Sequence, residues 1–257
     1  MAAHDSEQCS PNLSMSSNPA QGEDLHTLPS APAARSRERL THDADALVAY
    51  LRARLAAPQP TLQQMPQEPS DAPDALDEPP TYPAEWQDAR RAAVLAPLYA
   101  RDGAPYLLFT RRAATLAAHS GEISFPGGSR DPGDTDLAAT ALREAQEELA
   151  LAPERVTLLG TLPPAFTVVS NFLVTPWLGW LHEGLPPLAP NTGEVAEVIE
   201  APLAALDDPA IFHSEVWRRR GEAHTVYFYD FGPYRIWGLT GRLLHQILAL
   251  LPPRETP

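Results

Sequence analysis

The amino-acid sequence predicts an α+β fold, with helices around a mixed β-sheet, behind a disordered N-terminal tail. Short apolar runs typical of strands dominate from about residue 85 onward, and a few helical patterns accompany them. The first 85 residues instead hold 12 of the 29 prolines and 13 of the 33 acidic residues. We therefore expect an acidic, proline-rich tail over residues 1–84, one domain over 85–252, and a short C-terminal tail over 253–257.

The tail contains one stretch, residues 36–56, with a helical pattern. Its larger apolar side chains recur at spacings of three and four, at Leu40, Ala44, Leu47, Leu51 and Leu55. We expect an amphipathic helix here, which docks either on the domain or on a partner. Prolines and acids return over residues 57–83, and this composition is typical of an extended linker.

The domain opens with a predicted β-hairpin. Residues 92–99 and 106–111 have the composition of strands, and Asp102-Gly103 between them is typical of a tight turn. A short strand over 122–125 leads into a Pro-Gly-Gly sequence. Further strands are predicted at 156–162, 172–181, 195–199, 216–218, 225–231 and 234–237.

Two longer helices are predicted in the domain, over residues 136–149 and 239–251, with a helical turn at 203–206. In the first helix, one stripe of apolar residues spaced four apart should face the core; it comprises Leu137, Ala141, Ala145 and Leu149. We expect Asp134 to cap the N-terminus of this helix.

The composition excludes several classes of function. A net charge of −14 argues against a protein that holds nucleic acid through phosphate contacts. All 19 basic residues are arginine, which excludes a P-loop lysine, a Schiff base and a lysine general base. The single cysteine, Cys9, permits neither an intrachain disulfide nor a cysteine metal site.

The location is expected to be cytoplasmic, without membrane insertion. The first ten residues lack a basic region followed by an apolar run, so no secretory signal is predicted. The longest apolar run, residues 172–181, contains Pro176 and is too short to span a bilayer.

The most informative segment is Arg143-Glu144-Ala145-Gln146-Glu147-Glu148. Residues three and four apart share a helix face, so Glu144, Glu147 and Glu148 should converge on one side. Clustered carboxylate oxygens suit Mg²⁺ or Mn²⁺, and Arg143 can hold one carboxylate in a fixed orientation. The alternative for such a segment alone is a solvated helix face. The preceding strand, glycine pair and acidic loop favour a site, because they can curl backbone around a diphosphate while the helix supplies metal ligands.

The stretch from Gly127 to Leu151, GGSRDPGDTDLAATALREAQEELAL, resembles the Nudix box, G-x5-E-x7-R-E-U-x-E-E-x-G-U. The match needs one extra residue and becomes Gly128-x5-Asp134-x8-Arg143. Ala150 stands where the box has Gly, and Ala145 is small for the bulky apolar position U.

That extra residue, and a second signature upstream, resemble the coenzyme A diphosphatase branch of the Nudix hydrolases. The signature, roughly L-L-T-x-R-[SA]-x3-R-x3-G-x3-F-P-G-G, matches residues 108–128, from Leu108-Phe109-Thr110 to Phe125-Pro126-Gly127-Gly128. Phe109 replaces a Leu, and Ala117 replaces the second Arg. The stretches NTGEVAEVIEAPLAAL and YRIWGLTGRLL also resemble this branch, so the resemblance covers about residues 90–251.

This resemblance implies a Nudix α/β/α sandwich with a mixed central β-sheet. It also implies an Mg²⁺- or Mn²⁺-dependent hydrolase that cleaves coenzyme A or acyl-coenzyme A to 3′,5′-ADP and 4′-(acyl)phosphopantetheine. Glu144 and Glu148, one turn apart, would be the firmest metal ligands. Glu147 would be a third ligand or the catalytic base. Arg143 would orient a carboxylate.

Other residues have less specific expectations. Glu122 and Glu194 are further candidates for the base. Arg111 and Arg112 alternate across a strand, so only one can face a given side and contact a substrate phosphate. Gly127 and Gly128 would allow close approach of the substrate to the backbone. His119 is a candidate substrate contact, and the basic run 218–220 could attract a 3′-phosphate.

Two alternatives stay open. The substrate could be ADP-ribose, a dinucleotide or a nucleoside triphosphate, because Ala117 removes a signature arginine. The domain could also be a catalytically silent Nudix module used for binding, against which the three retained glutamates argue. The expected partner is a small nucleoside diphosphate derivative, with no nucleic acid and no membrane, and a homodimer is allowed.

Overall fold

The structure is a computed structural model of the 257-residue chain, and it describes residues 36–56, 86, 88–114, 121–167, 170–219 and 222–254. The linker expected over 57–83, Ala117 and His119 lie outside the described residues. The same holds for Arg220 and for residues 1–35, which include Cys9.

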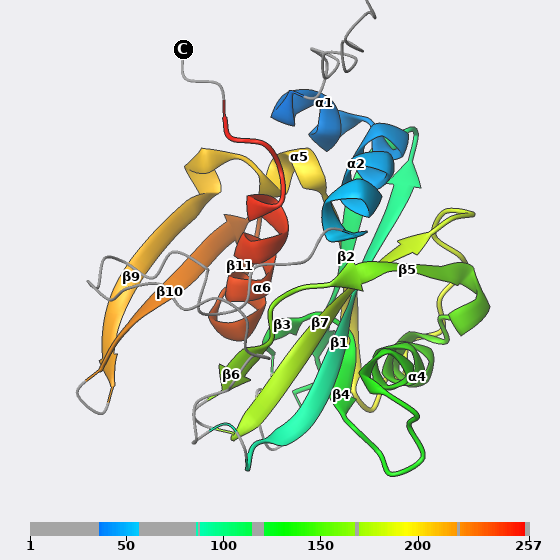
Figure 1. Cartoon of the computed structure of the whole chain (residues 1–257), viewed down its shortest axis with the longest axis vertical. Helices are drawn as coiled ribbons and strands as arrows, with labels where there is room; N and C mark the ends of the chain where they lie inside the picture. Colours follow the sequence, from blue (N-terminus) through cyan, green and yellow to red (C-terminus); the bar gives the residue numbers. More distant parts are fainter. Residues whose placement is uncertain are drawn as a thin grey trace, which may run out of the picture. The chain divides into compact units, whose positions relative to one another are not determined.

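The central sheet is built on β1 (Arg90–Arg101), which forms the predicted hairpin with β2 (Ala104–Arg112). Asp102 and Gly103 have φ values of 52° and 78°, the paired positive angles that a tight two-residue hairpin turn requires. On its other edge β1 runs parallel to β7 (Phe172–Leu181). The order β3-β2-β1-β7-β5 therefore contains parallel and antiparallel pairs, which confirms the predicted mixed sheet (Figure 1).

The remaining strands of this sheet are short or lie at its edges. They are β3 (Ile123–Ser124), β4 (Gly127–Ser129), β5 (Val156–Thr161), β6 (Ala165–Thr167) and β8 (Val195–Pro202). The strand β4 pairs with residues 92–94 of β1, whereas β2 pairs with residues 98–101. β7 pairs with one edge of β1, so β4 and β2 share the other edge. β4 pairs with the first part of β1, and β2 pairs with its last part. A second sheet has the order β11-β10-β9 and consists of β9 (Phe212–Arg219), β10 (Glu222–Phe231) and β11 (Tyr234–Ile236).

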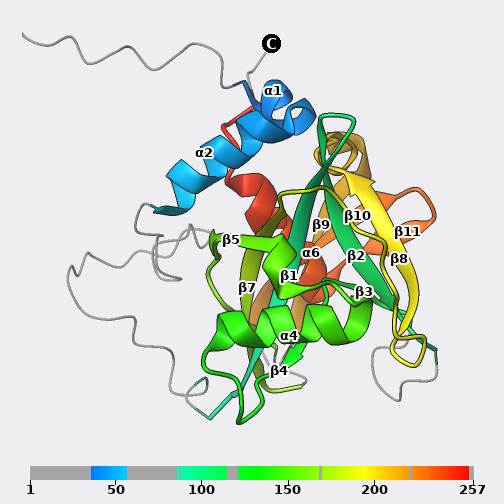
Figure 2. The same ribbon diagram turned by 90° about the vertical axis from the view of Figure 1, so that its right-hand side faces the viewer.

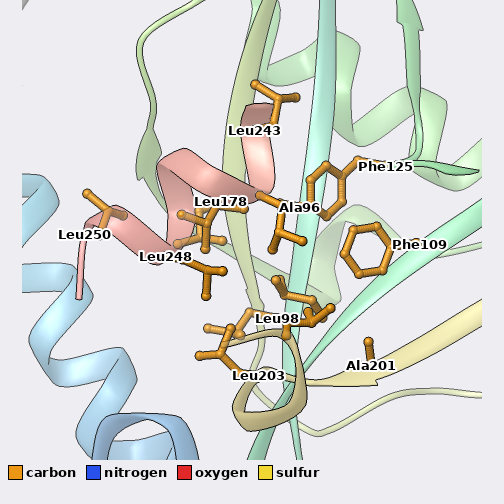
Figure 3. Packing of buried hydrophobic residues seen from close by; sticks show 14 of the residues in the cluster. Ala96, Leu98, Phe109, Phe125, Leu178, Ala201, Leu203, Leu243, Leu248 and Leu250 are labelled. Carbon is orange, nitrogen blue, oxygen red and sulfur yellow. The ribbon is translucent and has the colours of Figure 1, made fainter. Parts of the chain in front are cut away.

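Helices cover both faces of the central sheet. The helix α4 (Leu137–Leu149) packs on one face, and α6 (Gly238–Ala249) packs on the other (Figure 2). Successive side chains of a strand point to opposite faces, so Leu95 and Leu108 lie in the core under α4. Ala96, Leu98 and Phe109 lie instead in the core under α6 (Figure 3). The short helix α5 (Leu203–Leu206) and the 3-10 turns η1 (Pro153–Arg155) and η2 (Pro209–Ile211) complete the fold.

The helix expected over residues 36–56 forms as two helices, α1 (Arg37–His42) and α2 (Ala44–Ala56). The expectation of one helix was wrong at Asp43, whose backbone is extended (φ −127°, ψ 103°). The Oδ1 atom of Asp43 accepts a hydrogen bond from the Ala46 N–H at 2.9 Å and so begins a new helix. The apolar spacing survives the break, because Leu40, Leu47 and Leu51 are all buried.

These two helices share the core under α6. The Arg37 guanidinium donates to both carboxylate oxygens of Asp207 at 2.5–3.0 Å, and also to the Leu248 carbonyl oxygen at 3.1 Å. The Tyr50 hydroxyl donates to the Leu250 carbonyl oxygen at 2.9 Å. Of the two alternatives, the structure therefore shows docking on the domain. None of the helices in the described part of the chain has the length and apolarity needed to cross a membrane.

Candidate active site

The helix α4 is positioned by the stripe that the sequence predicted. Ala141, Ala145 and Leu149 are fully buried against the sheet, which turns the acidic side of the helix toward β4. The N-cap of the helix lies two residues later than predicted. Its N-cap is Asp136, whose Oδ1 accepts from the Ala139 N–H at 2.8 Å, so the assignment of this role to Asp134 was wrong.

Asp134 instead anchors Arg143. The guanidinium Nε donates to Asp134 Oδ1 at 3.0 Å, and Nη2 donates to Oδ2 at 3.2 Å. The Asp131 N–H and the Thr140 hydroxyl also donate to Oδ2, each at 2.9 Å. The hydrogen bond from Arg143 is the main reason that the pKa of the Asp134 carboxyl lies well below its usual range. The nine-residue spacing to Arg143 in the Nudix-like match was the signal for this pair.

Arg143 in turn connects the loop to two glutamates of α4. Its Nη2 donates to the Ser129 carbonyl oxygen at 3.0 Å and lies 3.0 Å from Glu144 Oε1. Its Nη1 donates to Glu147 Oε2 at 2.9 Å. Arg143 therefore contacts two glutamate carboxylates, and it keeps its positive charge because hydrogen bonding to Asp134 raises its pKa.

Glu148 is the most deeply placed acid of the helix. The residue is 3 % exposed, and the Gly127 N–H donates to its carboxylate. Its Oε2 atom is buried without a hydrogen-bond partner among the described residues. Burial is the main cause that raises the pKa of Glu148 to about 8, with Arg112 opposing and Glu144 and Glu194 adding to the shift. A buried carboxylate oxygen without a hydrogen-bond partner destabilises the folded protein unless a ligand contacts it.

Glu144 lies one turn earlier and presses against β4. A methyl group at Gly128 would lie 2.5 Å from Glu144 Oε1 and 2.6 Å from its carboxyl carbon, so only glycine leaves room for this carboxylate. Burial raises the pKa of Glu144, although the nearby Arg143 opposes the shift. At Gly127 a Cβ would lie 2.4 Å from the Ala93 carbonyl oxygen, so that glycine is required for the close pairing of β4 with β1.

The structure brings Glu144 and Glu148 together but sets Glu147 apart. The side chain of Glu147 is 56 % exposed, and its carboxylate is paired with Arg143. Within the described ranges, no three His, Cys, Asp or Glu side chains are grouped closely enough to hold one metal ion. The two desolvated carboxylates, with an unpaired oxygen between strand and helix, nevertheless fit a divalent cation in the chemistry of their donor atoms.

Arg111 and Arg112 lie on opposite faces of β2. Arg111 pairs with Glu197 through Nη2 and Oε2 at 2.8 Å, and the Tyr234 hydroxyl donates to the other oxygen of Glu197 at 2.5 Å. Arg112 lies on the α4 side, where its positive charge lowers the pKa of Glu148. Its Nε is buried without a hydrogen-bond partner in the described part of the chain. Of the two arginines, only Arg112 faces the acidic side chains of α4.

The other candidates differ in position. The residue before β8, Glu194, exerts its charge on both Glu144 and Glu148. The carbonyl oxygen of Glu122 accepts from the Arg112 N–H at 3.0 Å, which places that residue beside the end of β2. Trp217 of β9 and Trp237, the N-cap residue of α6, are both exposed, and each ring lies beside that of Phe228 on β10.

Fold and site together define an α/β/α enzyme in which a glycine-containing strand and an arginine-organised acidic helix form one centre. The NUDIX domain matches residues 89–221 of this chain. The uncharacterized Nudix hydrolase NudL of Photorhabdus laumondii is 44 % identical over 158 residues, which cover 62 % of this chain and 83 % of the relative. NudL of Cronobacter sakazakii is also 44 % identical over 158 residues, covering 62 % of this chain and 81 % of that relative.

The chain therefore belongs to the Nudix family, and it is a hydrolase that acts on pyrophosphate bonds. This finding favours the enzyme over the silent binding module. Among solved structures, an Ap4A hydrolase of C. elegans aligns with a TM-score of 0.43 and 22 % identity, covering 63 % of this chain and 97 % of that one.

Proposed function

We propose that this chain is a diphosphatase, dependent on Mg²⁺ or Mn²⁺, that hydrolyses coenzyme A or acyl-coenzyme A to 3′,5′-ADP and 4′-(acyl)phosphopantetheine. The observation that carries the hydrolytic chemistry is the buried, unpaired Oε2 of Glu148 beside the desolvated Glu144. Ionising both carboxyl groups at once is unfavourable in the free protein, and a divalent cation would offset both their repulsion and the lost hydration.

Glu144 and Glu148 are the proposed principal ligands of that cation, with Glu147 as a third that would have to leave Arg143. When bound, a divalent cation neutralises charge on the diphosphate and makes a bound water more acidic. Arg143 holds the Glu144 carboxylate toward β4 from a position fixed by Asp134. The backbone of Gly127 and Gly128 forms the wall against which the diphosphate would lie.

Arg112 is the proposed contact for a substrate phosphate. Its guanidinium lies on the side of the acidic helix, and its buried Nε has a hydrogen bond left to donate. The sequence made Arg111 a candidate for the same contact, but Arg111 is paired with Glu197 on the other face of β2. Arg111 therefore serves as the matched control. Loss of substrate binding in Arg112→Ala, with Arg111→Ala near wild type, is the expected pattern.

The coenzyme A assignment is supported by the second signature. Its residues Thr110-Arg111-Arg112 end β2, and its Phe125-Pro126-Gly127-Gly128 forms β4 and the turn before it. Arg112 at one end of the signature and Gly127-Gly128 at the other therefore lie near acidic side chains of α4, as expected if the signature contributes to substrate recognition. The domain limits of 85–252, the cytoplasmic location and a homodimer belong to the same proposal.

Product analysis by mass spectrometry tests this proposal. The purified chain is incubated with Mg²⁺ or Mn²⁺ and, separately, coenzyme A, acetyl-coenzyme A, ADP-ribose, NADH or a nucleoside triphosphate, each with a chelator control. Cation-dependent release of 3′,5′-ADP and 4′-phosphopantetheine is the expected result. Preferred cleavage of another compound would keep the diphosphatase chemistry and overturn the substrate. No turnover of any compound would overturn the proposal as a whole.

A further inference from the structure

We propose that Glu194, rather than Glu147, is the catalytic base that accepts the proton of the attacking water. This assignment rests on the proposed diphosphatase function. It comes from how the loop over residues 189–195 is attached to the two elements that form the site.

The loop is tied to the C-terminal end of α4. The Asn191 N–H donates to the Glu148 carbonyl oxygen at 2.8 Å, and the Ala189 N–H donates to the Leu149 carbonyl oxygen at 3.1 Å. Backbone hydrogen bonds of this kind fix the position of the loop relative to the helix, independently of any side chain. The loop is therefore held beside Glu148, whose carboxylate is the most buried of the helix.

The same loop is tied to the end of β2. The Ala113 N–H donates to the Glu194 carbonyl oxygen at 2.8 Å, and Ala113 directly follows Arg112. Glu194 is thus held between the last turn of the acidic helix and the strand that carries the proposed phosphate contact.

The carboxylate of Glu194 is oriented but not neutralised. Asn191 Nδ2 donates to Glu194 Oε1 at 3.2 Å, and within the described residues no arginine pairs with this carboxylate. Burial raises the pKa of both Glu144 and Glu148, and the charge of Glu194 raises each further. The Glu194 carboxylate is therefore near both helix carboxylates. Its Oε2 is left to accept a hydrogen bond from a water.

Glu147 is less suited to this role. Its carboxylate is largely in solvent and is paired with the Arg143 guanidinium at 2.9 Å. A base must lie within hydrogen-bond reach of the proton that it takes, so Glu147 would first have to leave Arg143. Among the described residues Glu194 has no arginine partner, and the described acids are not grouped closely enough for three of them to bind one ion. This separation of the acids fits a Glu194 carboxylate that contacts a water and not the cation.

The step balances as a hydrolysis. The water oxygen forms a bond to one phosphorus of the diphosphate, and its proton passes to the Glu194 carboxylate. The bond from that phosphorus to the bridging oxygen breaks, and the leaving phosphate keeps the electron pair. Two phosphate monoesters result, the proton on Glu194 returns to solvent, and no redox partner is needed.

The test compares Glu194→Gln with Glu147→Gln in the full-length chain, with Glu183→Gln as a surface control. Glu183 is exposed and pairs with Arg155 at 2.7 Å. For each variant, kcat and KM are measured on the substrate that wild type turns over best. Mn²⁺ affinity is measured by calorimetry, and Tm in chelator. Glu194→Gln should lower kcat by about 10²–10⁴-fold, with Mn²⁺ affinity and Tm close to wild type, whereas Glu147→Gln should act mainly on Mn²⁺ affinity.

Formate provides a second readout, because a small carboxylate can replace a missing base in a truncated variant. Glu194→Ala with added formate should regain turnover, whereas Glu148→Ala should not. Near-wild-type kcat in Glu194→Gln would overturn the assignment, and so would a loss of Mn²⁺ affinity in that variant or a larger loss of kcat in Glu147→Gln. If wild type itself cleaves nothing, the proposed function has failed, and the assignment of the base fails with it.

Discussion

Replacing Glu148 with glutamine should stabilise the cation-free protein while removing most of its turnover. The glutamine keeps the size and shape of the side chain, and its amide oxygen can still accept from the Gly127 N–H. What it removes is a carboxyl group that burial makes expensive to ionise. Stability and activity should therefore move in opposite directions at one residue.

The magnitude follows from the pKa of Glu148, which rises from 4.5 in the unfolded chain to about 8 in the folded protein. Between these values the folded state binds more protons than the unfolded state, so stability falls as the pH rises. The shifted pKa of Glu148 lowers the free energy of unfolding by at most about 1 kcal/mol at pH 5 and about 3 kcal/mol at pH 7. Glu148→Gln should recover about 1–3 kcal/mol of unfolding free energy at pH 7 and much less at pH 5.

The assay is urea denaturation of wild type and variant in chelator, at several values between pH 5 and pH 8. The difference in unfolding free energy should widen steadily across this range. Turnover of the variant with saturating cation should fall roughly a hundredfold or more, a loss of about 3 kcal/mol in transition-state stabilisation. A variant that is less stable than wild type at pH 7 to 8, or a difference that does not change with pH, would refute the reasoning.

Three further predictions concern the surroundings of the two carboxylates. Gly128→Ala should displace the Glu144 carboxylate and lower Mn²⁺ affinity about tenfold or more (about 1.4 kcal/mol) by calorimetry, while Gly133→Ala, where the new methyl meets nothing within 4 Å, should match wild type. Ala150→Gly should raise the unfolding free energy by about 0.5–1 kcal/mol with unchanged kcat, because Ala150 has a left-handed backbone (φ 57°) that glycine adopts freely; no gain in urea denaturation would contradict this. Asp134→Asn should cost about 2–3 kcal/mol near pH 7. The Asp134 carboxylate stabilises the fold above its unfolded pKa and stops doing so as the pH falls through its lowered folded pKa, so the difference from wild type should vanish in strong acid, and a difference independent of pH would count against it.

Local sequence signals predicted much of the fold. The alternation of apolar residues and the Asp102-Gly103 turn were enough for the β1–β2 hairpin, because a hairpin depends on neighbouring residues only. The four-residue spacing of the stripe gave the buried face of α4. The break at Asp43 was missed because the apolar spacing continues through it, and only the backbone angle and the new cap reveal it.

The site was harder to predict, because its geometry depends on contacts distant in sequence. Helical periodicity placed three glutamates on one side of α4, but it could not tell that Arg143 would hold Glu147 outward or that Gly128 would receive Glu144. Period-two alternation separated Arg111 from Arg112, yet the choice between them needed the packing of β2 on α4. Glu194 lies far along the chain, and only the loop's backbone hydrogen bonds bring it to the helix.

The most direct test of a cation site at Glu144 and Glu148 is calorimetric titration of wild type and Glu148→Gln with Mn²⁺ at pH 7, in two buffers of different ionisation enthalpy. Because Glu148 has a pKa of about 8 in the free protein, wild type should release close to one proton per ion bound. The variant should release almost none and bind at least tenfold more weakly. Equal affinity in the two proteins, with no proton release from wild type, would contradict the proposed centre.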